Sequence, residues 1–179
     1  KRKQVEEALD QERRLLRTLI DNLPDAIYAK DTAGRKTLAN LADLNNLHFK
    51  TEAEATGKTD FDLFPREQAE RLHADDQKVI QGRSVINREE HFSDEAGQDH
   101  WLLTSKLPLR DQDGKIIGLV GINRDITARK QAEIKLAHEQ GLFRTLMEYL
   151  PEAMYFKDLQ SHYVRISRSK IKQNLQLVR

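Results

Sequence analysis

Apolar residues near both ends of the chain recur at heptad spacing, with further apolar residues between them. This pattern predicts two amphipathic helices, over residues 1–22 and 128–150. Each apolar stripe contains one glutamate, Glu12 and Glu139, which weakens helix pairing but fixes its register. The helices either pair between two chains or pack on their own domain, and we expect pairing. The expected dimer seam contains Leu9, Leu16, Leu136, Glu139, Phe143 and Leu146.

Between these helices the pattern changes to short strand-like runs separated by turns. Two strands flank a turn at Asp31–Gly34, and a polar, helix-prone region follows up to Gly82. Three β-rich runs come next, over residues 84–94, 100–111 and 115–127. Gly118 and Gly121 in the last run indicate that another group packs close to its backbone. The order predicts an α+β fold, a five-stranded antiparallel sheet with short helices on one face.

The passage from the first helix into the first strand occurs twice. Residues 2–31 align without gaps on residues 129–158, and 16 of the 30 positions are identical. The match runs through the helix, a proline and the next strand, so helix composition alone does not explain it. We therefore expect an N-terminal helix at 1–22, a complete module at 23–127, a linker helix at 128–150, and the start of a second, truncated module at 151–179.

Composition narrows the function classes. The chain has 179 residues, a formal net charge of +1 and no cysteine. Neither a nucleic-acid partner nor an anionic membrane is indicated by such a charge, and disulfides, thiolate metal sites and cysteine nucleophiles are excluded. No apolar run approaches the roughly 20 residues that cross a bilayer. We expect a cytoplasmic fragment whose parent protein could be anchored elsewhere.

Several motifs resemble those of PAS domains of the sensor-box type. They are "LIDNLPDAIYAKD", Asn40 after the second strand, "GKTDFDLFP", "LPLRDQDGKIIGLVGINRDIT" and the exit helix "ARKQAE". The resemblance implies a PAS fold flanked by coiled-coil-like helices. It also implies that Asp125, Ile126 and Thr127 join the last strand to the output helix and relay a signal to attached kinase or cyclase domains.

In PAS domains, small molecules bind between the inner face of the sheet and the short helices. By this resemblance the ligand-binding candidates are Tyr28, His73, Arg88, Trp101, Lys106 and Asn123. Packing or solvation is the competing interpretation for each of them, and Trp101 lines either the cavity or the outer sheet. Dicarboxylate-binding members carry Arg and His clusters on the later strands, which Arg88, His91 and Lys106 match only weakly.

The cofactor is unknown, and we expect none. Cysteinyl-flavin and hydroxycinnamoyl photochemistry both require a cysteine and are excluded. Haem-binding members carry a ligand histidine in the helix before the third strand, but His73 is out of register with it. No metal site is expected.

No catalytic motif occurs in the sequence, so we expect no enzyme activity in this fragment. We expect a sensory or relay module of a multidomain regulator, with a histidine kinase as its output and a diguanylate cyclase next. Its partners would be a second copy, adjacent domains and a possible small ligand, without nucleic acid. The alternative is a PAS scaffold that dimerises or spaces other domains and senses nothing.

Overall fold

The computed structural model describes residues 2–93, 97–149, 154–167 and 171. The chain divides into two compact units, Lys1–Thr127 and Ala128–Arg179, which are described separately. In the first unit the helices are α1 (Arg2–Asp21), α2 (Leu41–Asn46), α3 (Glu52–Ala55), α4 (Asp60–Leu63) and α5 (Arg66–Ile80). The strands are β1 (Ala26–Asp31), β2 (Lys36–Ala39), β3 (Val85–Ser93), β4 (Asp99–Arg110) and β5 (Ile116–Asp125).

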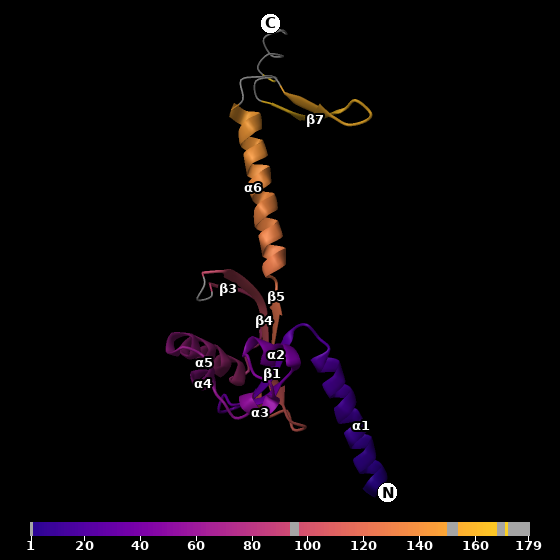
Figure 1. The fold of residues 1–179 in the computed structure, drawn as a ribbon, viewed down its shortest axis with the longest axis vertical. Helices are drawn as coiled ribbons and strands as arrows, with labels where there is room; N and C mark the ends of the chain where they lie inside the picture. Colours follow the sequence, from indigo (N-terminus) through magenta and orange to yellow (C-terminus); the bar gives the residue numbers. More distant parts are fainter. Residues whose placement is uncertain (1, 94–96, 150–153, 168–170, 172–179) are drawn as a thin grey trace. The chain divides into compact units, whose positions relative to one another are not determined.

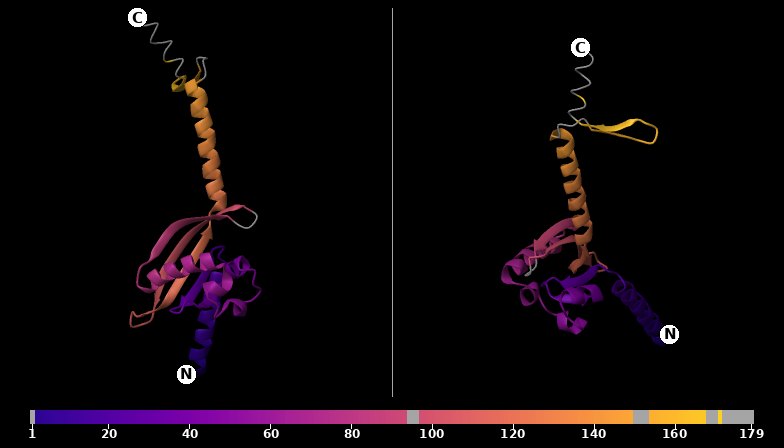
Figure 2. Two further views of the ribbon diagram at one scale, coloured as in Figure 1. Left: turned by 90° about the vertical axis from the view of Figure 1, so that its left-hand side faces the viewer. Right: turned by 45° about the horizontal axis from the view of Figure 1, so that its top comes forward.

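The five strands form one antiparallel sheet in the order β2-β1-β5-β4-β3. Figure 1 labels β1, β3, β4 and β5 of this sheet. Helix α5 packs on β4 and β5, and α2 packs on β1 and β2. Figure 2 shows α5 lying across one face of the sheet, which we call the inner face. The α+β layout predicted from the sequence is confirmed.

Local chemistry explains where the elements end. Asp31 accepts hydrogen bonds from the backbone N–H groups of Ala33 and Arg35, and Gly34 takes φ +79° in the resulting turn. Helix α5 ends at Ile80, and Gly82 takes φ +96° two residues later. Both turns were predicted from their glycine positions.

The two glycines of β5 allow close packing, as predicted. A Cβ atom on Gly121 would lie 2.2 Å from the ring of Tyr28, and one on Gly118 would lie 2.1 Å from the backbone oxygen of Lys30. The Tyr28 ring therefore lies across Gly121, on the strand that pairs with its own.

The apolar core is small. One buried cluster contains Tyr28, Val79 and Leu119, and a second contains Ala39, Leu44 and Ala55. Polar and charged side chains are buried beside these clusters, and several of them form the candidate site below.

The second unit contains α6 (Thr127–Tyr149), β6 (Tyr155–Lys157) and β7 (Tyr163–Ile166), with the two strands antiparallel. It repeats contacts of the first unit 127 residues later. Asn40 exchanges hydrogen bonds with the Ile27 backbone, and Ser167 exchanges them with the Met154 backbone. Of the predicted module at 151–179, the structure describes residues 154–167 and 171, and the rest lies outside the described residues. No helix in the described part of the chain has the length and apolar character of a membrane span.

Candidate functional site

Strand alternation brings a set of polar side chains to the inner face of the sheet. Tyr28 and Lys30 on β1 face the helices, as do Thr104 and Lys106 on β4. Gly121 of β5 lies between the two strands, because it pairs with Tyr28 on one side and with Lys106 on the other. The central strands of the sheet thus present two lysines to the interior.

These lysines meet two aspartates in what we call the buried charge cluster: Lys30, Lys106, Asp60 and Asp76. Lys30 Nζ lies 2.6 and 2.7 Å from the two carboxylate oxygens of Asp60, and 2.6 Å from Asp76 Oδ2. Lys106 Nζ donates to Asp76 Oδ1 at 2.5 Å. All four side chains are at most 5% exposed. Two positive and two negative charges balance, which is the condition for retaining ions in a protein interior.

A second buried ion pair, Lys36 with Asp43, lies beside Tyr28. Burial lowers the pKa of Lys36 and raises the pKa of Asp43, although their mutual attraction opposes both shifts. The Lys36 ammonium lies 4.5 Å from the centre of the Tyr28 ring. Burial, followed by the charges of Asp76 and Asp60, raises the pKa of Tyr28 well above its usual value, so the phenol stays protonated.

At the β3 side of the inner face, Arg88 forms ion pairs with Asp75 of α5 and with Glu90. Lys78 also donates to Asp75, at 3.2 Å. Burial would raise the pKa of Asp75, but the hydrogen bonds from Arg88 and Lys78 outweigh burial and the pKa is lowered. Asp75 and Asp76 together therefore tie α5 to three strands.

Two buried oxygen atoms in the described part of the molecule have no hydrogen-bond partner, Thr104 Oγ1 and Asn123 Oδ1. The two residues are directly paired across β4 and β5, beside the buried charge cluster. An unpaired buried acceptor costs free energy. A water molecule or a ligand N–H group at this position could supply the missing hydrogen bond.

The structure separates the predicted ligand residues into two groups. Tyr28, Arg88, Lys106 and Asn123 lie on the inner face, as described above. Trp101 belongs to the opposite face of β4, since it alternates with Thr104 and Lys106, and its ring lies 4.5 Å from that of His91. His73 on α5 contacts the ring of Phe61, at 5.6 Å between centroids. Arg88 and Lys106 lie on the inner face and His91 on the opposite face with Trp101, and they pair with Asp75, Asp76 and Asp99 respectively.

Sequence reasoning missed Lys30, Asp60 and Asp76. One available signal was the repeat, in which Tyr28 and Lys30 recur unchanged as Tyr155 and Lys157. Among the described residues, no group of three or more His, Asp and Glu side chains is arranged to hold a metal ion.

The exit joint, formed by Trp101 of β4 with Asp125, Ile126 and Thr127, connects β4 to the start of α6. Ile126 N donates to the carbonyl oxygen of Trp101 at 2.9 Å, and Trp101 N donates to Thr127 Oγ1 at 2.9 Å. Thr127 N donates to Asp125 Oδ1 at 2.8 Å. Burial would raise the pKa of Asp125, but the hydrogen bonds from Thr127 lower it. Ile126 is also buried. All three predicted relay residues therefore belong to the exit joint, Ile126 and Thr127 through hydrogen bonds to Trp101 and Asp125 through its hydrogen bond to Thr127.

The entry joint, formed by the side chains of Arg17 and Asn40 and their hydrogen-bond partners, fixes the end of α1. Arg17 donates to Asp21 and to Glu52, both at 2.7 Å, and to the Ala39 carbonyl oxygen at 3.1 Å. The Asn40 amide group donates to the carbonyl oxygens of Ile20 and Asp25 and accepts from the backbone of Ile27 and Asp43. Both helices that flank the sheet thus begin or end at a hydrogen-bonded joint.

The predicted seam residues are exposed except Phe143, which is half-buried and whose ring lies 5.4 Å from that of Phe156. Leu9 and Leu16 of α1 are 46% and 55% exposed, and Leu136 and Leu146 of α6 are 56% and 50% exposed. Apolar side chains at this spacing are available for a partner helix. Pairing itself stays a prediction.

The fold agrees with the comparisons to known proteins. A family model described as "PAS fold" matches residues 20–131, and this chain belongs to the PAS family. The sequence is 32% identical over 120 residues to the methanogenesis regulatory histidine kinase FilI of Methanothrix harundinacea, covering 67% of this chain and 13% of that protein. It is 32% identical over 127 residues to a diguanylate cyclase of Vibrio cholerae, covering 69% of this chain and 39% of that protein.

A solved structure of a VqmA–ligand–DNA complex from Vibrio cholerae has the same fold. Its TM-score is 0.55 at 26% identity, with 62% of this chain and 50% of that chain covered. The chain spans well under half of the two curated relatives, which are larger proteins. PAS homologues in sensor kinases and in a cyclase support a sensory module.

Proposed function

We propose that this chain is a regulatory PAS module that passes its conformational state through α1 and α6 to an attached output domain. A histidine kinase is the first choice for that domain and a diguanylate cyclase the second, in keeping with the proteins whose PAS segments it matches. Within the fragment the module itself is non-catalytic.

The exit joint is the observation that carries the proposal. The backbone N–H of Trp101 on β4 donates to Thr127 Oγ1, and its carbonyl oxygen accepts from Ile126 N. A movement of β4 must therefore move the start of α6 or break these two hydrogen bonds. β4 also carries Lys106, which binds Asp76 of α5. A change on the inner face therefore has a continuous bonded route to the output helix.

The proposal includes a small ligand as one input. VqmA, which has a similar fold, has been solved in complex with a ligand. In this chain the unpaired oxygens of Thr104 and Asn123 make the inner face the place to look. Native mass spectrometry of the freshly purified chain, compared with its denatured mass, tests this part. A retained mass of a few hundred daltons would support sensing, whereas a bare chain would favour relay without an endogenous ligand.

The relay is tested by joining residues 1–149 to the kinase region of FilI, in place of the segment of FilI that they match. Thr127→Val removes the acceptor for Trp101 N and should change the autophosphorylation rate about 5-fold or more, the lower range of allosteric coupling. Thr145→Val, also on α6 but bonded only within its own helix, is the matched control and should leave the rate unchanged. Equal rates for all three proteins, with the PAS module folded, would contradict the relay.

A second candidate is a PAS scaffold that pairs chains without sensing. The exposed apolar seam on both helices favours it. Sedimentation velocity on the purified chain should show a dimer, and Glu139→Leu should strengthen it, because an apolar residue would replace a charge in the seam. A dimer whose kinase fusion ignores Thr127→Val would favour the scaffold over the relay.

A further inference from the structure

The face of the sheet opposite to α5, which we call the outer face, carries apolar side chains. In register, one row across β2, β1, β5 and β4 is formed by Leu38, Ala29, Val120 and Leu107. Ile122 lies beside this row on β5. Leu107 is exposed, and Val120 and Ile122 are half-buried. An antiparallel sheet normally turns polar side chains to solvent on its free face, so this apolar row is suited to contact with a partner.

The helices with the main strand contacts in the described part of the first unit are α2, α3 and α5, and all three pack through inner-face residues. Leu44 of α2 and Ala55 of α3 are buried against Ala39, which pairs with Tyr28 of the inner face. Asp76 of α5 binds Lys106. These contacts leave the outer row for another element to cover.

Helix α1 has an apolar stripe that its own module does not cover. It contains no buried residue, and Leu16, Leu19 and Leu23 are exposed. Arg17, which is bonded to Glu52 at the entry joint, fixes a different side of the helix to the module. At about 100° per residue, Leu16 and Leu19 lie about 100° and 160° around the helix from Arg17. The stripe therefore faces away from the module to which α1 is anchored.

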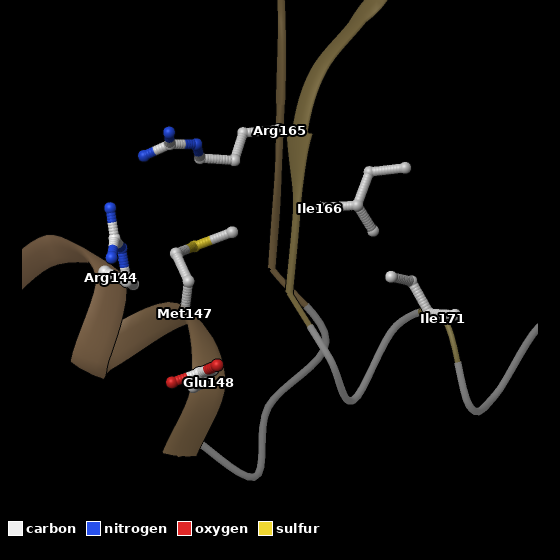
Figure 3. Close-up of a pocket in the computed structure, with 6 residues that line it drawn as sticks. All are labelled: Arg144, Met147, Glu148, Arg165, Ile166 and Ile171. Carbon is white, nitrogen blue, oxygen red and sulfur yellow. The ribbon is translucent and has the colours of Figure 1, made fainter.

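Helix α6 differs from α1 in this respect. Figure 3 shows Met147 of α6 with Ile166 and Ile171, which line a pocket of about 320 Å³ within the second unit. Met147 is buried, so part of the apolar surface of α6 is covered inside its own unit. No residue of α1 is covered in this way.

Charge and spacing match the stripe of α1 to the outer face. Glu12 lies in the stripe and is exposed. Arg124 lies on the outer face of β5, and its side chain is exposed although it binds Asp25. Along a helix, Glu12 is about 10 Å from Leu19. Along a strand, Arg124 is about 14 Å from Val120. The long arginine side chain spans the difference, so Glu12 reaches Arg124 when Leu19 rests on Val120.

We propose that the outer face binds α1 of a second copy of this chain. Each copy packs its stripe on the outer row of the other, and Glu12 pairs with the partner's Arg124. One kind of contact then covers both apolar surfaces. The inference rests on the pairing of chains named as the second candidate function and specifies which surfaces meet. Leu9 and Leu16 contact the partner's sheet in this arrangement, and the seam residues of α6 are not involved.

Disulfide cross-linking tests the arrangement, because the chain has no cysteine of its own. Leu19→Cys and Leu107→Cys are made in separate chains with tags of different mass, which are mixed in equal amounts and oxidised. The mixed disulfide is the expected product. Arg14→Cys is the matched control, since it is exposed on α1 about 140° around the helix from Leu19, and it should give no mixed disulfide. Adding Val120→Glu to the Leu107→Cys chain should abolish the mixed product, because a charge then interrupts the apolar row.

A second pair of variants tests the charge contact. Glu12→Arg in the Leu19→Cys chain should lower the yield of mixed disulfide, and Arg124→Glu in the Leu107→Cys chain should restore it. Circular dichroism confirms that each variant is folded before it is mixed. No restoration in folded variants would overturn the pairing of Glu12 with Arg124.

Other products would overturn the proposal as a whole. A disulfide between two Leu19→Cys chains without the mixed product would indicate that helices pair with each other, and one between two Leu107→Cys chains would indicate that sheets do. A cyclised monomer of the double variant Leu19→Cys/Leu107→Cys would assign the outer face to the chain's own α1. Equal yield with Arg14→Cys, or no cross-link at all, would also contradict it. The kinase fusion is not used, so failure of the relay and failure of this contact are observed separately.

Discussion

The buried charge cluster makes a sharp prediction about stability. Asp76→Asn leaves Lys106 without a carboxylate partner among the described residues and gives the cluster a net charge of +1. Lys106→Met leaves Asp60 and Asp76 to share Lys30 and gives a net charge of −1. Each single change strands a buried charge, which costs about 3–5 kcal/mol in the free energy of unfolding.

The double variant, Asp76→Asn with Lys106→Met, removes one charge of each sign. The remaining cluster has a net charge of zero, with Lys30 paired to Asp60. Its loss of stability should therefore be smaller than the sum of the two single losses by about 2–3 kcal/mol, a strong coupling for residues in contact. A typical domain has only about 5–15 kcal/mol to lose, so this difference is readily measured.

Urea unfolding, followed by the fluorescence of Trp101 and by circular dichroism, measures all four proteins under the same conditions. Asp113→Asn is the matched control, because Asp113 is exposed in a turn and should change stability by less than about 0.5 kcal/mol. A loss below about 1 kcal/mol for Asp76→Asn, or strictly additive losses in the double variant, would refute the reasoning.

Three further predictions use other features of the fold. Gly121→Ala should destabilise the chain by about 1–3 kcal/mol in urea unfolding, since its Cβ would overlap the Tyr28 ring, and a neutral result would contradict that packing. Gly141→Ala meets no neighbouring atom and should stabilise α6 by about 1 kcal/mol, seen as a higher melting temperature; no increase would argue against a continuous helix there. Arg88→Gln tests pH dependence. Because the pKa of Asp75 is lowered in the folded protein, its ionised carboxylate stabilises the fold at a pH above its pKa in the unfolded chain, about 3.9. This stabilisation is lost as the pH falls through the pKa of Asp75 in the folded protein. The difference in stability between wild type and Arg88→Gln should therefore shrink between pH 5 and pH 3. A constant difference across this range would contradict the role of Arg88.

The sequence by itself determined the elements and their order, because local chemistry specifies them. Asp31 and Gly34 form a turn from hydrogen bonds within five residues, and Gly82 follows the end of α5 with a backbone conformation that suits glycine. Gly118 and Gly121 indicated close packing before any partner was known. The repeat likewise followed from direct comparison of the chain with itself.

The candidate site depended on the tertiary structure. Lys30 and Lys106 are polar residues within strands, and local pattern alone does not distinguish a buried lysine there from a solvent-facing one. Only the sheet order, which puts β1, β5 and β4 in the centre beneath α5, buries them and brings Asp76 within bonding distance of both.

The same reason explains Trp101 and the two joints. Period-two alternation assigns residues of β4 to two faces but cannot say which face the helices cover. Docking of α5 placed Lys106 inside and Trp101 on the opposite face, while the Trp101 backbone still reached Thr127. Sequence identifies which residues share a face, and the packing of distant elements decides which face becomes the interior.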